Sequence, residues 1–285
     1  MIRRNFLSTA AAGTFWAAAG GVADERAAVR KSVNAGRIFK ALKAPKELSS
    51  EELTALKALG FDGIEGRPGT IKDFPAYRDR LAEAGLAMHG MVGSLHWKQR
   101  LSDPEPKVRA IGLEALLEGI RQSRVLGGSS VLLVVGRVDK NATHEEVWSR
   151  SITEIRKAIP EASKRGIRIL VETVWNGFCE DPTQFRDYLD EIGSPWVGAY
   201  FDIGNMQKFA PAEEWIRVLG TRTVKLDVKD WGEKHGFCPL GEGEVNWAKV
   251  REAIAETEFT GWATREGQDG GNDKTARLMD ELLDL

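Results

Sequence analysis

The sequence is poor in the residues that build soft-metal and covalent-catalysis sites. It has only two cysteines, Cys179 and Cys238, and four histidines in 285 residues. Two cysteines cannot make a disulfide framework, so we expect both thiols to be free. Four histidines are too few for a His-rich trinuclear zinc site, and the chain has no Gly-x-Ser-x-Gly elbow. These absences disfavour zinc-dependent DNA repair enzymes and serine hydrolases.

The sequence also lacks a large excess of either charge and any long apolar run. Forty Lys and Arg nearly balance 42 Asp and Glu, for a formal net charge of −2, and no long basic run occurs. The sequence therefore lacks the electrostatic footprint of a nucleic-acid-binding protein. No segment has the roughly 20 apolar residues of a membrane-spanning helix. We expect neither a nucleic-acid partner nor a stable membrane span.

The first 23 residues differ in composition from everything that follows. Arg3 and Arg4 precede Phe6 and Leu7, and a stretch of small apolar residues then runs to about Ala19. This order resembles a twin-arginine export signal, with small-residue cleavage positions after Ala19 or Ala23. We therefore predict that residues 1–23 direct export to the periplasm or the outside of the cell. A leader that stays uncleaved is the alternative.

After this leader, a short apolar strand, a loop and an amphipathic helix recur up to the C-terminus. We expect strands at 31–34, 62–65, 86–91, 129–135, 167–172, 197–202, 224–228 and 262–266. Continuously apolar runs such as VLLVV and IRILV are typical of parallel strands covered on both faces. No Gly-x-Gly-x-x-Gly follows the first strand, which disfavours a dinucleotide-binding sheet. The pattern predicts an α/β fold, a single-domain (β/α)₈ TIM barrel over residues 30–285.

Several helix boundaries are marked by local signals. Ser49-x-x-Glu52 and Thr143-x-x-Glu146 have the spacing of a capping box. Asp103-Pro104 and Asp181-Pro182 each offer an N-cap followed by a proline at the first helical position. We expect a helix to begin at each of these four places.

Four acidic residues end the last four predicted strands: Glu172, Asp202, Asp227 and Glu266. The C-terminal ends of parallel barrel strands share one mouth, so these side chains should converge there. Each alone could be a helix cap, but four in consecutive strands are harder to explain in that way. Four close carboxylates repel one another unless a cation lies between them. We predict one bound divalent metal ion, Mn²⁺ or Mg²⁺ before Co²⁺ or Zn²⁺, because all the donors are oxygens.

Four motifs carry a resemblance to a known family: VETVWN, SPWVGAYFDIGN, GEGEVNW and TGWATREG. From about residue 30 onward the chain resembles the xylose-isomerase-like TIM barrels, in particular L-ribulose-5-phosphate 3-epimerases and hydroxypyruvate isomerases. The resemblance implies one divalent metal held by Glu, Asp, His and Glu. Glu172, Asp202 and Glu266 match this pattern. Asp227 stands where the family has His, which keeps an oxygen donor and adds negative charge.

The resemblance also implies an activity. We expect a sugar isomerase or epimerase that removes a proton next to a carbonyl through an enediolate, with Glu172 and Glu266 as the acid/base pair. Export favours a free or keto sugar over a phosphorylated one. Two alternatives stay open: a lyase or dehydratase acting on keto-sugars or inososes, and a non-catalytic carbohydrate-binding barrel, which Asp227 favours. A homo-oligomer is possible.

Residues near the predicted strand ends are candidates for contacts with a carbohydrate substrate. They are Glu65, His89, His96, Trp175, Asn176, Asn205 and Lys229. Trp175 offers an aromatic wall for a sugar ring, and its alternative role is packing below the rim. Asn205 could instead stabilise its loop through a side-chain turn. Lys229 lies two positions after Asp227, on the same side of the strand, where it could pair with the carboxylates.

Overall fold

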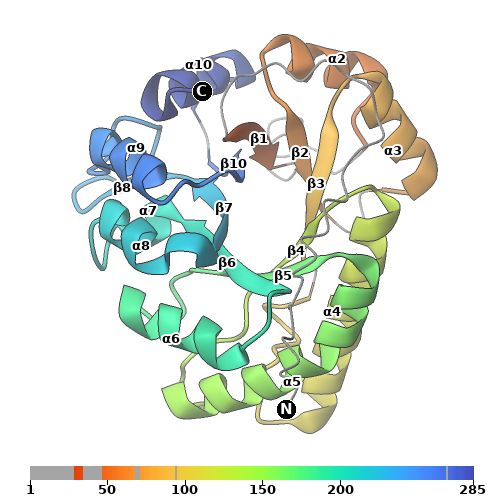
Figure 1. Ribbon diagram of the computed structural model, residues 1–285, viewed down its shortest axis with the longest axis vertical. Coiled ribbons are helices and arrows are strands. Elements are labelled where there is room, and N and C mark those ends of the chain that lie inside the picture. Colours follow the sequence, from red (N-terminus) through yellow and green to blue (C-terminus); the bar gives the residue numbers. More distant parts are fainter. Residues whose placement is uncertain (1–28, 35–46, 68–70, 94, 268) are drawn as a thin grey trace, which may run out of the picture.

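The computed structural model describes residues 29–34, 47–67, 71–93, 95–267 and 269–285 (Figure 1). Within them, eight parallel strands close into a barrel in the order β1-β10-β7-β6-β5-β4-β3-β2. The barrel strands are β1 (Arg30–Asn34), β2 (Gly63–Gly66), β3 (Ala87–Val92), β4 (Ser130–Leu133), β5 (Arg168–Glu172), β6 (Val197–Asp202), β7 (Thr223–Val228) and β10 (Trp262–Arg265). The predicted TIM barrel is confirmed, and each strand boundary agrees with the prediction to within about two residues. The predicted export signal lies outside the described residues.

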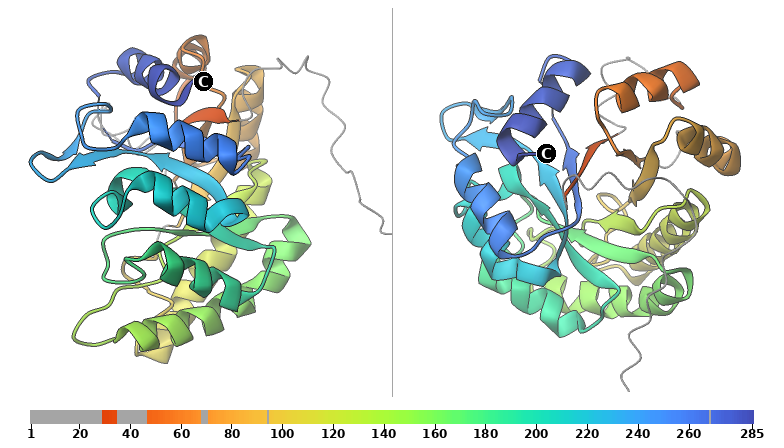
Figure 2. Two further views of the ribbon diagram at one scale, coloured as in Figure 1. Left: turned by 60° about the vertical axis from the view of Figure 1, so that its left-hand side comes forward. Right: turned by 45° about the horizontal axis from the view of Figure 1, so that its top comes forward.

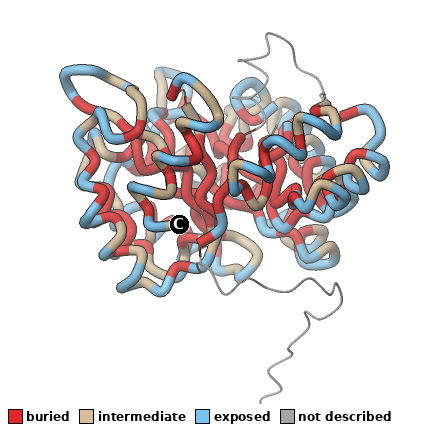
Figure 3. The backbone as a smooth tube through the Cα atoms, turned by 90° about the horizontal axis from the view of Figure 1, so that it is seen from above, coloured by how far each residue is buried: buried red, intermediate tan, exposed pale blue. Residues whose placement is uncertain are grey.

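Helices form the outer layer of the barrel (Figure 1). They are α2 (Ser50–Ala58), α3 (Phe74–Glu83), α4 (Pro106–Val125), α5 (His144–Arg165), α6 (Pro182–Ile192), α7 (Ile203–Met206), α8 (Ala212–Leu219), η1 (Gly220–Arg222), α9 (Trp247–Glu256) and α10 (Asn272–Leu283). Buried residues follow the strands and the inward sides of the helices, while the outer helical surfaces are exposed (Figure 3). No described helix combines the length and the apolar character needed to cross a membrane.

Three of the four predicted helix starts are confirmed. Both capping boxes form, at Ser49 and at Thr143, and Asp181 caps α6 through its side chain. The fourth prediction is wrong, because α4 begins at Pro106 and not at Pro104. Asp103 accepts a hydrogen bond from the N–H of residue 105, in the turn ahead of the helix. On sequence grounds Pro104 and Pro106 fit the first turn of a helix equally well. The turn formed by Asp103 and residue 105 places the start of the helix at Pro106.

The inside of the barrel has an apolar layer and a polar layer. Val92, Leu132, Leu170 and Tyr200 form a buried apolar cluster. His89 lies in the middle of β3 and not at its end, which corrects the sequence-based placement.

Polar groups surround the His89 ring inside the barrel. Its nitrogens lie 2.6 Å from Ser32 Oγ and 2.6 Å from Lys225 Nζ, and the ring stacks on Trp262. Burial, followed by the charge of Lys225, lowers its pKa well below the usual value. His89 is therefore a neutral interior group, held away from the mouth.

A short hairpin that the sequence analysis missed follows β7. Its strands β8 (Asp230–Gly232) and β9 (Gly236–Cys238) pair antiparallel and project beyond the barrel wall (light blue in Figure 2, left). The buried Asp230 carboxylate fixes the base of the hairpin, because it accepts hydrogen bonds from Gly241 N at 2.8 Å and Trp247 Nε1 at 3.0 Å. The hairpin is thus anchored to the following loop and to α9.

Both cysteines are free, as predicted. Cys179 is buried and Cys238 is partly exposed.

Candidate metal centre

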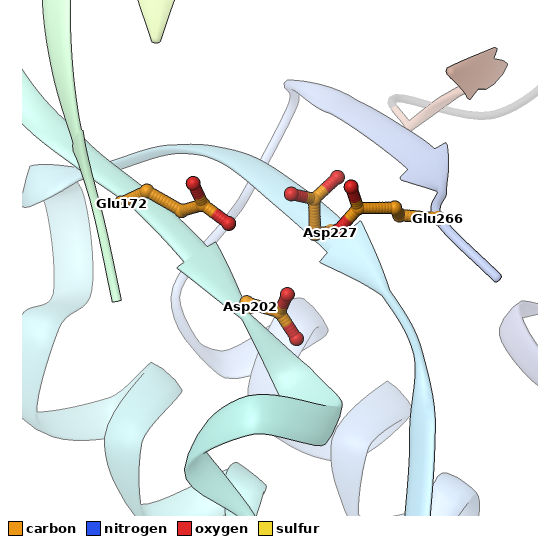
Figure 4. Close-up of side chains that lie close together, drawn as sticks. All are labelled: Glu172, Asp202, Asp227 and Glu266. Atoms are coloured by element: carbon orange, nitrogen blue, oxygen red, sulfur yellow. The ribbon is translucent and has the colours of Figure 1, made fainter. Parts of the chain in front are cut away.

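Four carboxylates meet at the C-terminal ends of neighbouring strands. Glu172 and Asp202 end β5 and β6, Asp227 lies one residue before the end of β7, and Glu266 directly follows β10. Each offers one oxygen, and these four oxygens lie within 4.8 Å of one another. Figure 4 shows the four side chains pointing into a common space. The structure therefore brings together the residues that the strand-end argument selects; we call them the acidic cluster.

The convergence of the acidic cluster is electrostatically unfavourable. Burial and the Glu266 charge raise the pKa of Asp202 to about 6, although Lys229 opposes the shift. Burial and then Glu266 also raise the pKa of Glu172 and of Asp227 well above the usual range. Such shifts arise when like charges share a desolvated site. The four carboxylates therefore carry more negative charge than the residues around them balance.

Lys229 supplies one positive charge to the acidic cluster. Its ammonium nitrogen lies 2.7 Å from Asp202 Oδ2 and also forms an ion pair with Glu266. Burial would lower the pKa of Lys229, but the surrounding carboxylates raise it well above its usual value. The predicted pairing of Lys229 with the carboxylates is confirmed, and one ammonium leaves most of the negative charge unbalanced.

The donor chemistry of the acidic cluster fits a hard divalent cation. All four residues offer carboxylate oxygens, the ligands that Mg²⁺ and Mn²⁺ prefer. Asp227 Oδ1 is buried and has no hydrogen-bond partner among the described residues, so its lone pairs are available to a cation. With Asp in place of the family His, residue 227 still provides an oxygen donor.

A cavity of about 280 Å³ adjoins the acidic cluster. Its lining residues are Asn34, Arg67, Val92, Gly93, His96, Trp97, Leu132, Glu172 and Glu266. Most of these belong to β1–β4 and the segments that follow them, so this mouth cavity lies on the side of the barrel opposite β6 and β7. A ligand in the mouth cavity would meet two cluster carboxylates on one side and hydrogen-bond donors on the other.

His96 contributes a neutral donor to the mouth cavity. Its Nδ1 accepts a hydrogen bond from Val134 N at 3.1 Å, so the ring proton is assigned to Nε2. Burial and the nearby Arg67 charge lower its pKa to about 4, which keeps the ring uncharged at neutral pH. Gly93 permits this placement, because a Cβ there would lie 2.7 Å from His96 Nδ1.

Three other residues that were predicted to contact the substrate form hydrogen bonds to protein groups. Glu65 is fully buried, does not line the mouth cavity and accepts a 3.4 Å hydrogen bond from Asn34 Nδ2. Asn176 donates to Gly136 O at 2.8 Å. Asn205 donates its backbone N–H to Asp202 Oδ1 at 2.8 Å, which orients a cluster carboxylate. All three residues thus form hydrogen bonds within the protein, around the mouth.

Among the polar and aromatic residues that line the mouth cavity, sequence reasoning missed three: Asn34, Arg67 and Trp97. Asn34 ends β1 and Arg67 directly follows β2, so the strand-end argument that found the acids would have found both. Trp97 lies in the segment after β3, and no local pattern distinguishes it from a packing residue.

A larger cavity, of about 430 Å³, lies at the opposite end of the barrel, around the beginnings of the strands. Arg30, Arg168 and Lys225 line it, together with one carboxylate, Glu258. It has no group of metal-binding side chains among its described lining residues. In TIM barrels chemistry belongs to the C-terminal ends of the strands, so we assign the candidate site to the smaller cavity.

Known proteins share this architecture. Residues 53–284 match the family model described as xylose isomerase-like TIM barrel. An Escherichia coli K12 protein named "Putative L-ribulose-5-phosphate 3-epimerase SgbU" is 24% identical over 238 residues, covering 76% of this chain and 82% of the relative. A solved L-ribulose 3-epimerase superposes with a TM-score of 0.74 at 21% identity, covering 90% of this chain and 95% of the other. A D-tagatose 3-epimerase-like protein gives 0.76 at 16% identity, covering 90% and 97%.

Proposed function

Because the chain belongs to the xylose isomerase-like TIM-barrel family, we propose that it is a sugar isomerase or epimerase that depends on one divalent metal ion. The observation that carries this proposal is the acidic cluster, whose four carboxylate oxygens lie within 4.8 Å of one another beside a cavity. The relatives named above are sugar 3-epimerases by name, which supports the reaction class. The substrate is a small carbohydrate with a carbonyl group.

The residues that would hold the metal are Glu172, Asp202, Asp227 and Glu266. A divalent ion bound there supplies Lewis acidity, which polarises a carbonyl and stabilises negative charge on the substrate oxygens. Asn205 supports this role from the following loop, because its N–H donates to Asp202 Oδ1 and fixes that carboxylate.

Glu172 and Glu266 are the proposed acid/base pair. Both line the mouth cavity, so both can reach a bound substrate, whereas Asp202 and Asp227 are buried behind them. Burial and then the Glu266 charge raise the pKa of Glu172 well above the usual range, the direction expected for a carboxyl group that exchanges protons. A general acid or base works best when its pKa lies near the working pH.

His96 has a proposed orienting role on the opposite wall. His96 lines the mouth cavity and its ring stays neutral, so as a proposed donor it would bond to a hydroxyl or carbonyl oxygen through Nε2–H. Trp97 also lines the cavity and is half exposed, which suits packing against the apolar face of a sugar.

Isotope exchange at the substrate carbon tests the reaction. Ketoses, aldoses and keto-sugars are incubated in D₂O with Mn²⁺, Mg²⁺ or Co²⁺ and followed by NMR after removal of the ion. We expect metal-dependent deuterium incorporation next to the carbonyl of at least one free sugar. Products that have lost a β-substituent would favour the lyase or dehydratase. Sugar binding without any exchange would favour the non-catalytic barrel and contradict the proposal.

We also propose that the protein is exported, which makes a free or keto sugar the substrate. The support is the Arg3-Arg4 pair and the apolar stretch after it. Mass spectrometry of the protein from its native host should find a chain that begins after Ala19 or Ala23. An intact Met1 in the cytoplasm would contradict export.

A further inference from the structure

Exposed aromatic side chains gather at the mouth on the side away from the mouth cavity. Trp175 follows β5 and Phe237 lies in β9, and their rings stack with centroids 4.8 Å apart. Trp231 meets Trp175 edge-on at 6.1 Å. Phe237 is 51% exposed and Trp175 is 39% exposed. Adjoining aromatic rings left in contact with water often mark a binding surface; we call these three rings the aromatic surface.

The aromatic surface adjoins the acidic cluster. Lys229 Nζ lies 5.6 Å from the centre of the Phe237 ring and 2.7 Å from Asp202 Oδ2. The mouth cavity lies on the other side of the same carboxylates, and it shares Glu172 and Glu266 with the cluster. A ligand longer than one sugar ring could therefore occupy the cavity and the aromatic surface together.

The aromatic surface is fixed before any ligand arrives. Trp175 Nε1 donates to the backbone oxygen of Asn205, which is itself bonded to Asp202. The hairpin that carries Phe237 is anchored through Asp230. Side chains that are already ordered lose little conformational entropy when a ligand binds, so little of the binding free energy is spent on fixing them.

The chemistry of the aromatic surface suits a sugar ring. A pyranose has apolar C–H faces and a rim of hydroxyl groups, which match aromatic rings beside polar groups. Lys208 provides such a group, since its Nζ lies 4.6 Å from the centre of the Trp175 ring. Continuity with the acidic cluster favours a second ring of the same ligand over a second protein copy.

We propose that Trp175 and Phe237, with the Lys208 ammonium over the Trp175 ring, form a second sugar subsite, so that the ligand of this mouth is a glycoside or disaccharide. One ring occupies the mouth cavity and the linked ring lies on the aromatic surface. This inference rests on the proposed function for the identity of the first ring, but its binding test does not require turnover.

The test compares monosaccharides with disaccharides that contain the same ring, such as D-fructose with maltulose and isomaltulose, and D-glucose with cellobiose. Binding to the Mg²⁺-loaded full chain is measured by saturation-transfer NMR and calorimetry. We expect at least one disaccharide to bind about tenfold more tightly than its monosaccharide, the scale of one good aromatic contact. Phe237→Ala should bring this ratio close to one.

Ile111→Ala is the matched control, because Ile111 on α4 is 50% exposed, as Phe237 is, but neither lines the mouth cavity nor belongs to the aromatic surface. It should leave the affinity ratio at the wild-type value. Trp97→Ala, in the mouth cavity, should weaken monosaccharide and disaccharide binding together.

Three results would overturn the second subsite. One is a panel in which no disaccharide binds more tightly than its monosaccharide, including a panel in which neither binds. Another is an affinity ratio unchanged by Phe237→Ala. The third is a wild-type dimer, seen by sedimentation, that Phe237→Ala dissociates, because the aromatic surface would then be a subunit interface. Metal-dependent exchange on a monosaccharide with an unchanged ratio would keep the proposed function and remove only the subsite.

Discussion

Two groups of charges, one buried and one partly buried, lie side by side at the end of β10, and they are balanced in opposite ways. Arg265 pairs with Asp269 through two hydrogen bonds of 2.8 Å and 2.7 Å, and Thr275 Oγ1 and Leu240 N donate to the same carboxylate. Burial alone would raise the pKa of Asp269, but these partners lower it to about 2. The next residue after Arg265 is Glu266, a member of the acidic cluster, where the pKa of Asp202 rises to about 6.

The contrast separates structural charge from functional charge. Asp269 is matched by a guanidinium and further hydrogen-bond donors, so its negative charge holds the last βα loop against α10. In the acidic cluster, Lys229 is the one described residue that forms ion pairs with the four carboxylates, and it pairs with Asp202 and Glu266. A fold gains nothing from such an imbalance, and unmatched buried charge with shifted pKa values is typical of a functional site.

The largest effect is expected from variants of the acidic cluster that lose a proton-exchanging group but keep an oxygen ligand. Glu172→Gln and Glu266→Gln each keep a carbonyl oxygen but cannot exchange a proton. We expect either change to lower turnover by about 10²–10⁴-fold, the usual contribution of general acid–base catalysis. Steady-state kinetics on the substrate found by isotope exchange measures the loss.

Glu213→Gln is the control for these variants, because Glu213 is a buried glutamate on α8 that belongs neither to the acidic cluster nor to the lining of the mouth cavity. It should leave turnover close to that of the wild type. If one Gln variant loses exchange and the other keeps it, a single base operates. Near-normal turnover in both variants would contradict the acid/base assignment.

Arg265 and Asp269, which we call the matched pair, should contribute to the stability of the fold and not to turnover. Asp269→Ala leaves the Arg265 guanidinium buried without its carboxylate, and breaking such a pair typically costs about 3–5 kcal/mol of unfolding free energy. Asp190→Ala removes an exposed ion pair with Arg222 and should cost less than about 1 kcal/mol. Urea unfolding measures both. Equal losses in the two variants would show that burial does not distinguish the pairs.

The sequence predicted the acidic cluster because barrel geometry converts strand order into proximity. Glu172 and Glu266 are far apart in the chain, yet both stand at strand ends, and parallel strands carry their C-terminal ends to one mouth. The periodic apolar runs that defined the strands are strong local signals. Fold and cluster could therefore be predicted without any knowledge of tertiary contacts.

The aromatic surface and the position of His89 could not be predicted in the same way. Phe237 lies on a hairpin held by Asp230, whose partners Gly241 and Trp247 come from later segments, so its placement depends on long-range hydrogen bonds. His89 lies at a register shift between β2 and β3, which turns it toward Lys225 inside the barrel. Neither feature has a periodic signal in the sequence.

Metal affinity provides a third, smaller test of the acidic cluster. Asp202→Ala removes a direct oxygen ligand and its charge, so we expect the Mn²⁺ affinity to fall by more than about 100-fold. Thr173→Val removes only the hydroxyl that accepts from Asp202 N at 2.9 Å, and such an indirect change typically costs about 10–100-fold. Calorimetric titration of metal-free protein gives both constants. No measurable metal binding by the wild type would refute the metal centre itself.

The smallest expected effect is a pH dependence confined to the matched pair. The folded pKa of Asp269, about 2, lies below its usual value of 3.8, so the unfolded chain takes up the proton first as the pH falls. The stabilisation by the ionised carboxylate is therefore complete above about pH 5 and lost progressively below about pH 4. Wild type should lose about 1 kcal/mol more than Asp269→Asn between pH 5 and pH 3 in urea unfolding. Because Asp269 is buried, added NaCl should leave this difference almost unchanged, whereas an exposed pair such as Arg222–Asp190 is screened. A difference that salt abolishes would mean that Asp269 behaves as a surface charge, and the contrast with the acidic cluster would no longer hold.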